Sequence, residues 1–317
     1  MEQASTTLDA AWRGKRVLVT GGAGFVGRHL VRALHAAGAQ LGLLLRHPWP
    51  EFDAEQVFIG DLREREFVAA AVTAWQPEVV FHLAASRVRS LTAAAFAEAI
   101  DVNLIGTLYL LEALAHGSHI KRVVLLGTAE EYGRGPVPFR EDVRESPVSA
   151  YSLSKLSSTH LAQMMAHNLG MPVTVLRPSV AYGPEQQEDM FLPALIRALL
   201  RGERFAMTAG EQTRDFVYID DLVQALGRVG LIGNTSGEVI NIGGGHAIRI
   251  ADLVDHVERM TDARGRAQRN ALAYRPGEAM NYQLDISKAE KLLEWRPQTS
   301  LEQGLERTIA WYRTHLA

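Results

Sequence analysis

The stretch RVLVTGGAGFVGRHLVRAL, residues 16–34, decides the fold class of this protein. An apolar run that predicts a buried strand leads into Gly21, Gly24 and Gly27, and an amphipathic helical pattern follows them. Glycines at such a turn let the backbone approach a ligand closely, and the free amides at the start of the helix favour an anion such as a pyrophosphate. The stretch therefore predicts a dinucleotide-binding turn, with a glycine-rich turn that holds no ligand as the alternative.

Composition and charge narrow the class of protein. The chain has 317 residues, 47% of them hydrophobic, which is enough for one large or two modest domains. The net charge is -3, and basic and acidic residues are interspersed along the chain. No basic patch that would bind nucleic acid or an anionic membrane is therefore predicted. The absence of cysteine excludes disulfides and thiolate metal sites, and it predicts a cytoplasmic location; no metal is expected. No apolar run approaches the ~20 residues of a membrane helix, so no membrane partner is expected.

Short apolar runs alternate with helical patterns along most of the chain. The runs are continuous rather than alternating, as in strands buried on both faces of a parallel sheet, and they cover residues 16–21, 40–46, 78–85, 121–128 and 172–179. This predicts an α/β fold with a Rossmann doubly wound parallel sheet. After Tyr182 the rhythm loosens, which predicts a smaller, discontinuous C-terminal lobe. The expected boundaries are a lead-in over 1–14, a dinucleotide-binding domain over 15–178 with 213–260 returning to it, and a substrate-binding lobe over 179–212 and 261–317.

The end of the second predicted strand bears on which dinucleotide binds. An acidic residue there would accept hydrogen bonds from both ribose hydroxyls of NAD. The sequence LLLRHPWP has no acidic residue. Arg46 stands there instead, with a guanidinium suited to a 2′-phosphate, so NADP(H) is favoured and NAD(H) is the alternative. Asp61, after the next short strand, can accept from the adenine amino group or cap the helix that follows.

A second group of residues carries candidate chemistry. Tyr151 and Lys155 are four residues apart in a predicted helix, so their side chains share one face. An ammonium beside a phenol lowers the pKa of the tyrosine and makes it a usable proton donor. Thr128 follows a predicted strand at the edge where open parallel sheets bind ligands, so its hydroxyl can orient a substrate oxygen toward Tyr151.

These motifs, taken in order, resemble one known family. They include GxxGxxG at 21–27, FHLAA with His82, DVNLIGTLYLLEA with Asn103, the set of Thr128 with Tyr151-x-x-x-Lys155, LRPSVAYGP, RDFVYIDDLV and LDISKAEKLLEWRP. From residue 16 onward the chain is similar to the extended short-chain dehydrogenase/reductases that act on nucleotide sugars. The resemblance implies a Rossmann domain for NAD(P), a lobe for a nucleoside-diphosphate sugar, and a Thr-Tyr-Lys triad.

The resemblance also implies roles for single residues. Asn103 supports the active-site helix, although a helix-bridging role alone is the alternative, and His82 is interpreted as a packed strand residue. The substrate-binding candidates are Arg87, Thr128, Arg214 and Arg275, the last two at positions that resemble diphosphate contacts. The cofactor-binding candidates are Gly21, Gly24, Phe25, Val26, Gly27, Arg46, Asp61, Leu62, Leu83, Ala84, Ala85, Asn103, Tyr151, Lys155, Pro178, Ser179 and Val180.

The reaction is less constrained than the family. Dehydratases of this family carry a Thr-Asp-Glu sequence, and here Glu130 matches the base while Ala129 replaces the acid. Arg46 resembles the arginine of members that use NADPH as an exchanging reductant. We therefore expect an NADPH-dependent 4-ketoreductase of a nucleoside-diphosphate 4-keto-6-deoxy sugar, with Thr128, Tyr151, Lys155 and Glu130 as catalytic candidates. The alternatives are a 4-epimerase, a 4,6-dehydratase and, against the intact triad, a non-catalytic NAD(P)-binding protein.

The quaternary state is also predicted. Helices expected over 93–116 and 150–168 resemble the pair that forms a four-helix bundle between subunits in this family, and the sequence LAQMMAHNL offers apolar positions beyond those that face a sheet. The expectation is a homodimer.

Overall fold

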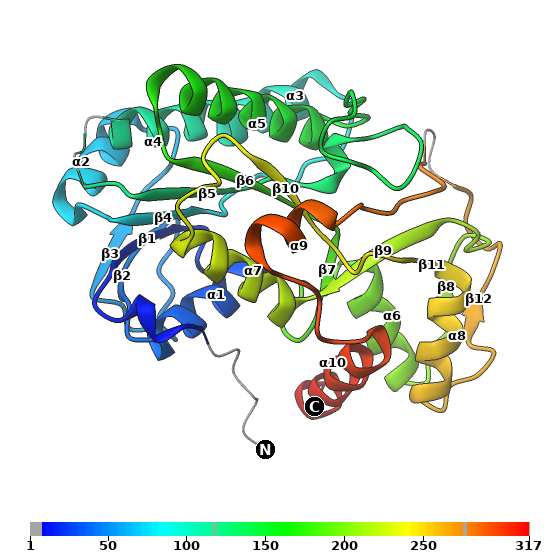
Figure 1. Ribbon diagram of the computed structural model, residues 1–317. Helices are drawn as coiled ribbons and strands as arrows, with labels where there is room; N and C mark the ends of the chain where they lie inside the picture. The colour runs from blue at the N-terminus through cyan, green and yellow to red at the C-terminus, as the bar shows by residue number, and fades with distance from the viewer. Residues whose placement is uncertain (1–7, 116, 118, 275–277, 317) are drawn as a thin grey trace.

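The apolar runs predicted as strands lie side by side in one parallel sheet (Figure 1). The computed structural model describes residues 8–115, 117, 119–274 and 278–316, and within them the sheet has seven strands in the order β10-β6-β5-β4-β1-β2-β3. The strands are β1 (Arg16–Thr20), β2 (Gln40–Leu45), β3 (Gln56–Ile59), β4 (Val79–His82), β5 (Arg122–Leu126), β6 (Val173–Pro178) and β10 (Val239–Ile242). The predicted doubly wound α/β fold is confirmed.

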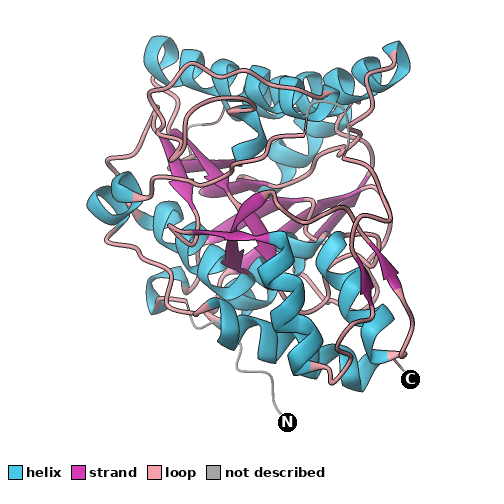
Figure 2. Ribbon diagram, turned by 90° about the vertical axis from the view of Figure 1, so that its right-hand side faces the viewer, coloured by secondary structure: helices cyan, strands magenta, loops and turns pink. Residues whose placement is uncertain are grey.

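Helices cover both faces of this sheet, as the strands buried on two sides require. Figure 2 shows the strands as a layer with helices above and below it. Helices α2 to α5 pack on one face, while α1 and α7 pack together on the other (Figure 1). The bounds are α1 (Phe25–Ala36), α2 (Arg65–Trp75), α3 (Ala93–Ala99), α4 (Gly106–Ala115), α5 (Ala150–Leu169) and α7 (Ile219–Leu231).

A π-helical segment, Ile100–Ile105, joins α3 to α4. The three pieces run on as one helical stretch of 23 residues, Ala93–Ala115, that is long and apolar enough to cross a membrane by length and composition. The expectation that no apolar segment reaches that length is therefore wrong, because the polar residues at 101 and 103 interrupt the run in sequence but not the helix. The stretch packs against α2 and α5, and a core helix of a water-soluble protein passes the same test.

A smaller set of elements lies beyond the carboxyl ends of the sheet strands. Strand β7 (Val180–Tyr182) comes directly after β6 in the chain. It forms a second sheet with β9 (Thr213–Tyr218) and β11 (Ala247–Arg249), in the order β11-β9-β7. Two short strands, β8 (Phe205–Ala206) and β12 (Ala267–Gln268), pair next to it. The helices of this part are α6 (Phe191–Leu200), α8 (Ile250–Met260) and α10 (Leu301–His315). Helix α9 (Ser287–Leu293) packs against β10 and α7 of the main layer. Strand β10 returns to the main sheet beside β6.

The fold begins earlier than the predicted boundary at residue 15. Leu8 is buried, and Trp12, in a short 3₁₀ turn (Ala10–Trp12), is fully buried. The Trp12 ring lies 5.8 Å from the ring of Phe81 on β4. Leu8 and Trp12 therefore pack into the core against α7, although the residues between and after them are exposed, and a tryptophan buries a large apolar surface.

Candidate active site

The glycine turn between β1 and α1 is required by close backbone packing. Gly21 has φ of +72°, and a Cβ there would lie 2.6 Å from the Ala84 nitrogen. A Cβ on Gly27 would lie 2.1 Å from the Gly21 carbonyl oxygen. Gly24 is the residue before α1 and makes no side-chain capping bond, so the first amides of the helix remain free for a ligand. An anionic group such as a pyrophosphate fits this cradle.

A cleft of about 1620 Å³ extends from this turn across the carboxyl ends of the strands to the smaller lobe. Its volume exceeds that of a pocket for one small ligand, roughly 300–1,000 Å³, and suits a cofactor and a substrate together. Its lining includes every predicted site residue that the structure describes, with one exception, Asn103. Arg275 lies outside the described residues.

The cleft wall directly after β2 has basic side chains, and an acidic one, Asp61, follows the neighbouring strand β3. Leu45 closes the strand and is only 5% exposed, and Arg46 and His47 follow it along the cleft wall. Asp61 accepts a bidentate contact from the Arg63 guanidinium and a backbone bond from the Arg63 amide. The predicted capping role is wrong, because the N-cap residue of α2 is Glu64 and the Asp61 carboxylate binds Arg63 instead. Asp61 lines the cleft, and its contact with the adenine amino group stays a prediction.

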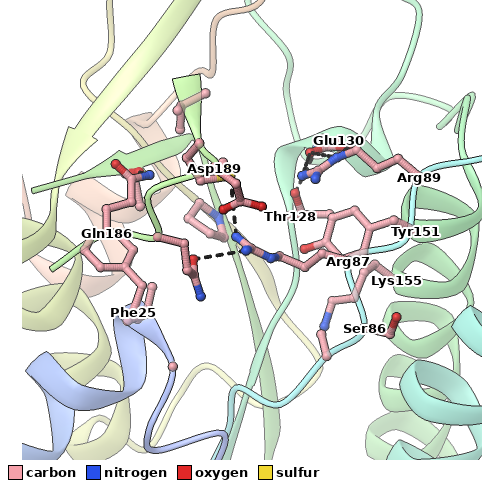
Figure 3. A pocket seen from close by; sticks show the side chains of 18 of the residues that line it. Phe25, Ser86, Arg87, Arg89, Thr128, Glu130, Tyr151, Lys155, Gln186 and Asp189 are labelled. Atoms are coloured by element: carbon pink, nitrogen blue, oxygen red, sulfur yellow. Dashed lines mark hydrogen bonds and ion pairs between the residues drawn. The ribbon is translucent and has the colours of Figure 1, made fainter. Parts of the chain in front are cut away.

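Thr128, Tyr151 and Lys155 meet at the centre of the cleft (Figure 3). Helix α5 starts at a capping box in which Ser149 and Ser152 satisfy each other's backbone amides, and this places Tyr151 in the first turn. Lys155 follows one turn later on the same face, as the spacing predicts. Thr128 comes from the loop after β5, where it caps a 3₁₀ turn (Ala129–Glu131). All three side chains are buried.

Burial sets the protonation behaviour of these groups. Desolvation lowers the pKa of Lys155 to about 8, against the opposing charge of Glu131. Burial raises the pKa of Tyr151, and the Glu130 charge raises it further, while Arg89 and the hydrogen bond with Thr128 lower it. The cation that lowers the pKa of Tyr151 is thus Arg89. The helix spacing predicts Lys155 in that role.

Glu130 is not a free base in this structure. Both of its carboxylate oxygens accept from Arg89, whose Nε lies 3.3 and 3.2 Å from them and whose terminal nitrogen lies 2.7 Å from Oε1. Burial alone would lower the pKa of Arg89, but the hydrogen bond and charge of Glu130 raise it. Arg89 lies on the loop after β4, and sequence analysis assigned it no role.

A fully buried ion pair stands behind Thr128. Glu131 accepts from the Thr128 amide (2.8 Å), the Thr159 hydroxyl (2.8 Å) and Nε of Arg177 (2.7 Å). Arg177 also donates to Glu145 at 2.9 Å. Every bond to Glu131 comes from a different element, so this carboxylate fixes the backbone that carries Thr128. The second glutamate of TAEEYG was the available sequence signal for it.

Asn103 bridges elements behind the cleft and does not line it. Its Oδ1 accepts from the Ser86 amide (2.8 Å), and its Nδ2 donates to the Ser86 carbonyl (2.9 Å) and to the Ser154 hydroxyl (2.8 Å). These bonds show the bridging role that was the alternative for Asn103, while its contact with the cofactor stays a prediction. It ties the loop after β4 to helix α5.

The substrate end of the cleft contains two of the predicted arginines. Arg87 donates to the Gln187 side chain at 3.0 Å. Arg214 pairs with Glu278 and donates to the Ala279 carbonyl at 2.8 Å, so it is locally paired as well as exposed to the cleft. Sequence analysis missed the buried Tyr282, which lines the cleft near Arg214 and whose hydroxyl has no hydrogen-bond partner among the described residues.

His82 is a packed strand residue, as interpreted from sequence. Its ring nitrogens lie 2.7 Å from the Thr20 hydroxyl and 3.0 Å from the Thr107 hydroxyl. Burial lowers its pKa to about 3, so the ring is neutral and bridges β1 to α4. Among the described residues no group of three or more acidic or histidine side chains could hold a metal ion.

A Rossmann turn with a Thr-Tyr-Lys set at the carboxyl edge of a parallel sheet defines the class, an extended short-chain dehydrogenase/reductase. Comparison with known proteins gives the family. Residues 17–243 match the model of the NAD dependent epimerase/dehydratase family. The chain belongs to that family and is an enzyme of the NAD(P)-dependent type.

Three relatives illustrate the range of the family. The chain is 32% identical to dTDP-glucose 4,6-dehydratase 1 of Escherichia coli over 94% of its own length and 92% of that protein. It is 34% identical to a UDP-glucuronate 4-epimerase of Thermodesulfobacterium geofontis over 68% of its length and 67% of that protein. The structure of MoeE5 in complex with UDP-glucuronic acid and NAD matches with a TM-score of 0.87 and 33% identity, covering 95% of this chain and all of that one.

Proposed function

We propose that this protein is an NADPH-dependent 4-ketoreductase of a nucleoside-diphosphate 4-keto-6-deoxy sugar. The observation that carries the proposal is the pairing of two features in one cleft. Thr128 and Tyr151 converge at its centre, and Arg46 stands at its adenosine end where no acid follows Leu45. The Arg46 guanidinium is suited to bind the 2′-phosphate that NADPH carries on its ribose. NADPH is also the reductant of choice in net reductions.

The chain's own residues divide the work. The free amides of α1 after Gly24 would hold the pyrophosphate, and Arg46 the 2′-phosphate. Bound beside Tyr151, the reduced nicotinamide supplies a hydride to the sugar C4. The Thr128 hydroxyl orients the C4 carbonyl oxygen, and Tyr151 donates its phenol proton to that oxygen as the alkoxide develops. Lys155, buried and facing the cleft, would bind the cofactor ribose.

The substrate diphosphate would lie toward the smaller lobe. Arg214 and Arg87 are the cleft-lining guanidinium groups in that direction, and each is held by a partner that a diphosphate can replace. Charge-assisted bonds from guanidinium to phosphate are the strong contacts such a substrate offers.

Dehydration is disfavoured by two features of the site. The acid that would protonate the leaving hydroxyl is missing, because Ala129 stands at its position and is fully buried. The base that would take the C5 proton, Glu130, has both oxygens engaged by Arg89. These two observations support reduction rather than dehydration as the proposed reaction.

A 4-epimerase is the second candidate, because a UDP-glucuronate 4-epimerase is among the relatives. Epimerisation uses the same residues but leaves the cofactor bound and unchanged overall.

The two functions differ in whether the cofactor is consumed, and this difference can be measured. The enzyme is mixed with NADPH and dTDP- or GDP-linked 4-keto-6-deoxy sugars, and loss of reduced nicotinamide absorbance is followed. In parallel, UDP-glucuronate and UDP-glucose with NAD⁺ are followed by proton NMR. Stoichiometric NADPH loss supports the reductase, and C4 inversion without net cofactor change replaces it with the epimerase.

A homodimer through α5 and the helical stretch Ala93–Ala115 is also proposed. Large apolar side chains remain exposed on these helices, with Ile100 at 37%, Leu153 at 38% and Met164 at 48% exposed. An apolar face of this kind on adjacent helices suits packing against a second copy. The mass measured by light scattering at micromolar concentration tests this, and substitution of Leu153 and Met164 by glutamate should give monomers.

A further inference from the structure

Arg89 lies over the face of the catalytic-site tyrosine. Its guanidinium carbon is 5.2 Å from the centre of the Tyr151 ring, within the range of a cation–π contact. The same guanidinium is fixed on its other side by the two-oxygen contact with Glu130 (Figure 3). Arg89 and Glu130 are 41 residues apart in sequence and come from the loops after β4 and β5.

The arrangement puts one carboxylate and one guanidinium beside a phenol that must lose its proton. Glu130 opposes ionisation of Tyr151, whereas Arg89 favours it. The pair is about one-third exposed, at 36% and 35% of the side-chain surfaces, so water screens it only in part. If Arg89 lost its charge, Glu130 would stand uncompensated next to Tyr151.

We propose that Arg89 is a positioning residue that cancels the charge of Glu130 and stabilises the phenolate of Tyr151 from the face of its ring. The inference rests on the proposed function in that Tyr151 exchanges a proton with the substrate, and it holds for C4 reduction and C4 epimerisation alike. Arg89 acts through Tyr151 and needs no contact with the sugar. The pairing has a second effect, because it keeps the Glu130 oxygens from a substrate C5 proton.

The other charged or titratable groups around Tyr151 are accounted for. Glu131 faces it from the turn after Thr128, Lys155 follows it on α5, and Tyr282 approaches from the segment before α9. Glu131 is already satisfied by Arg177, Thr159 and the Thr128 amide. Removal of the Arg89 charge therefore takes away the cation over the Tyr151 ring and leaves Glu130 as the uncompensated charge beside it.

The test is a double-mutant cycle with Arg89→Gln, Glu130→Gln and the double variant. A unit charge about 5 Å away shifts a pKa by roughly two units at an effective dielectric of ~20, and partial exposure reduces this to about one. We expect the ionisation midpoint of Tyr151 to rise by about one pH unit in Arg89→Gln, to fall in Glu130→Gln, and to return near the wild-type value in the double variant. Arg89→Lys, which keeps the charge, should shift it by less than half as much.

Two readouts separate this inference from the proposed function. The first is ¹³C NMR of Cζ-labelled tyrosine in the protein with NADP⁺ present, with Tyr151→Phe to assign the signal; it needs no substrate. The second is the pH dependence of kcat/KM on whichever nucleotide sugar is turned over. Arg87→Gln is the control, since Arg87 is on the same loop but turns toward Gln187, and its Tyr151 midpoint should stay at the wild-type value. An unchanged midpoint in Arg89→Gln, or no recovery in the double variant, would overturn the inference. If no sugar is reduced or epimerised, the proposed function fails while the NMR titration still decides the role of Arg89.

Discussion

Replacing Lys155 by methionine should stabilise the protein while removing its activity. Lys155 is 3% exposed, and burial lowers its pKa from 10.5 to about 8. At 1.36 kcal/mol per pH unit, this corresponds to about 3 kcal/mol by which the folded state disfavours the charged ammonium. Methionine has a similar shape and no charge, so Lys155→Met should raise the free energy of unfolding at pH 7 by about 2–3 kcal/mol. Function then accounts for a buried charge that costs stability.

The pH dependence gives the sign of the effect. Below about pH 8 the lysine is charged in both states, so the penalty is fully present. Between about pH 8 and 10.5 the unfolded chain holds a proton that the folded protein has released, so the stability of the wild type rises with pH and the advantage of the variant shrinks. Urea unfolding of both proteins from pH 6 to 10 measures this difference.

A matched control is available on the surface. Lys121 is 67% exposed and pairs with Glu78 at 2.6 Å, so Lys121→Met should change stability by less than about 1 kcal/mol and in the unfavourable direction. If Lys155→Met were no more stable than the wild type at pH 7, or if its advantage were the same at every pH, the desolvation argument would be refuted. Lys155→Met should also bind NADPH more weakly than the wild type and no longer turn over the sugar.

Three further outcomes follow from single side chains. Tyr151→Phe removes only the proton donor, so steady-state kinetics should show kcat lower by ~10² to 10⁴ with NADPH affinity retained, and near-normal turnover would contradict the assignment. Arg46→Ala should abolish a preference for NADPH over NADH of about tenfold to hundredfold, measured by fluorescence titration; equal wild-type affinities would exclude the phosphate role. Asn103→Ala removes the partner of the Ser86 amide and carbonyl and the donor to the Ser154 hydroxyl, which keeps its own bond to the Tyr151 carbonyl. Its unfolding free energy should fall by about 2–4 kcal/mol and its Tm by roughly 3–6 °C, and a change below about 1 °C would show that water replaces these bonds.

The local sequence determined the scaffold and the central pair of the site. Continuous apolar runs predicted five of the seven sheet strands, because burial on both faces of a parallel sheet leaves no polar alternation, and they missed the largely exposed edge strand β3. The glycine spacing predicted the turn, since Gly21 and Gly27 occupy positions where a Cβ would meet the backbone. Tyr151 and Lys155 were placed on one face by the helical period alone. Each of these features depends on residues within a few positions of one another.

The tertiary structure alone decided the electrostatics of the site. Arg89 meets Glu130 because the carboxyl ends of β4 and β5 are neighbours in the sheet, and no local pattern in the two loops specifies that pairing. Asn103 reaches Ser86 and Ser154 only because the helical stretch after β4 packs against α5. Trp12 likewise became a core residue through contact with Phe81 on a distant strand. Side-chain pairing across loops depends on the register and packing of the whole sheet, and it is this packing that fixes which charges stand beside Tyr151.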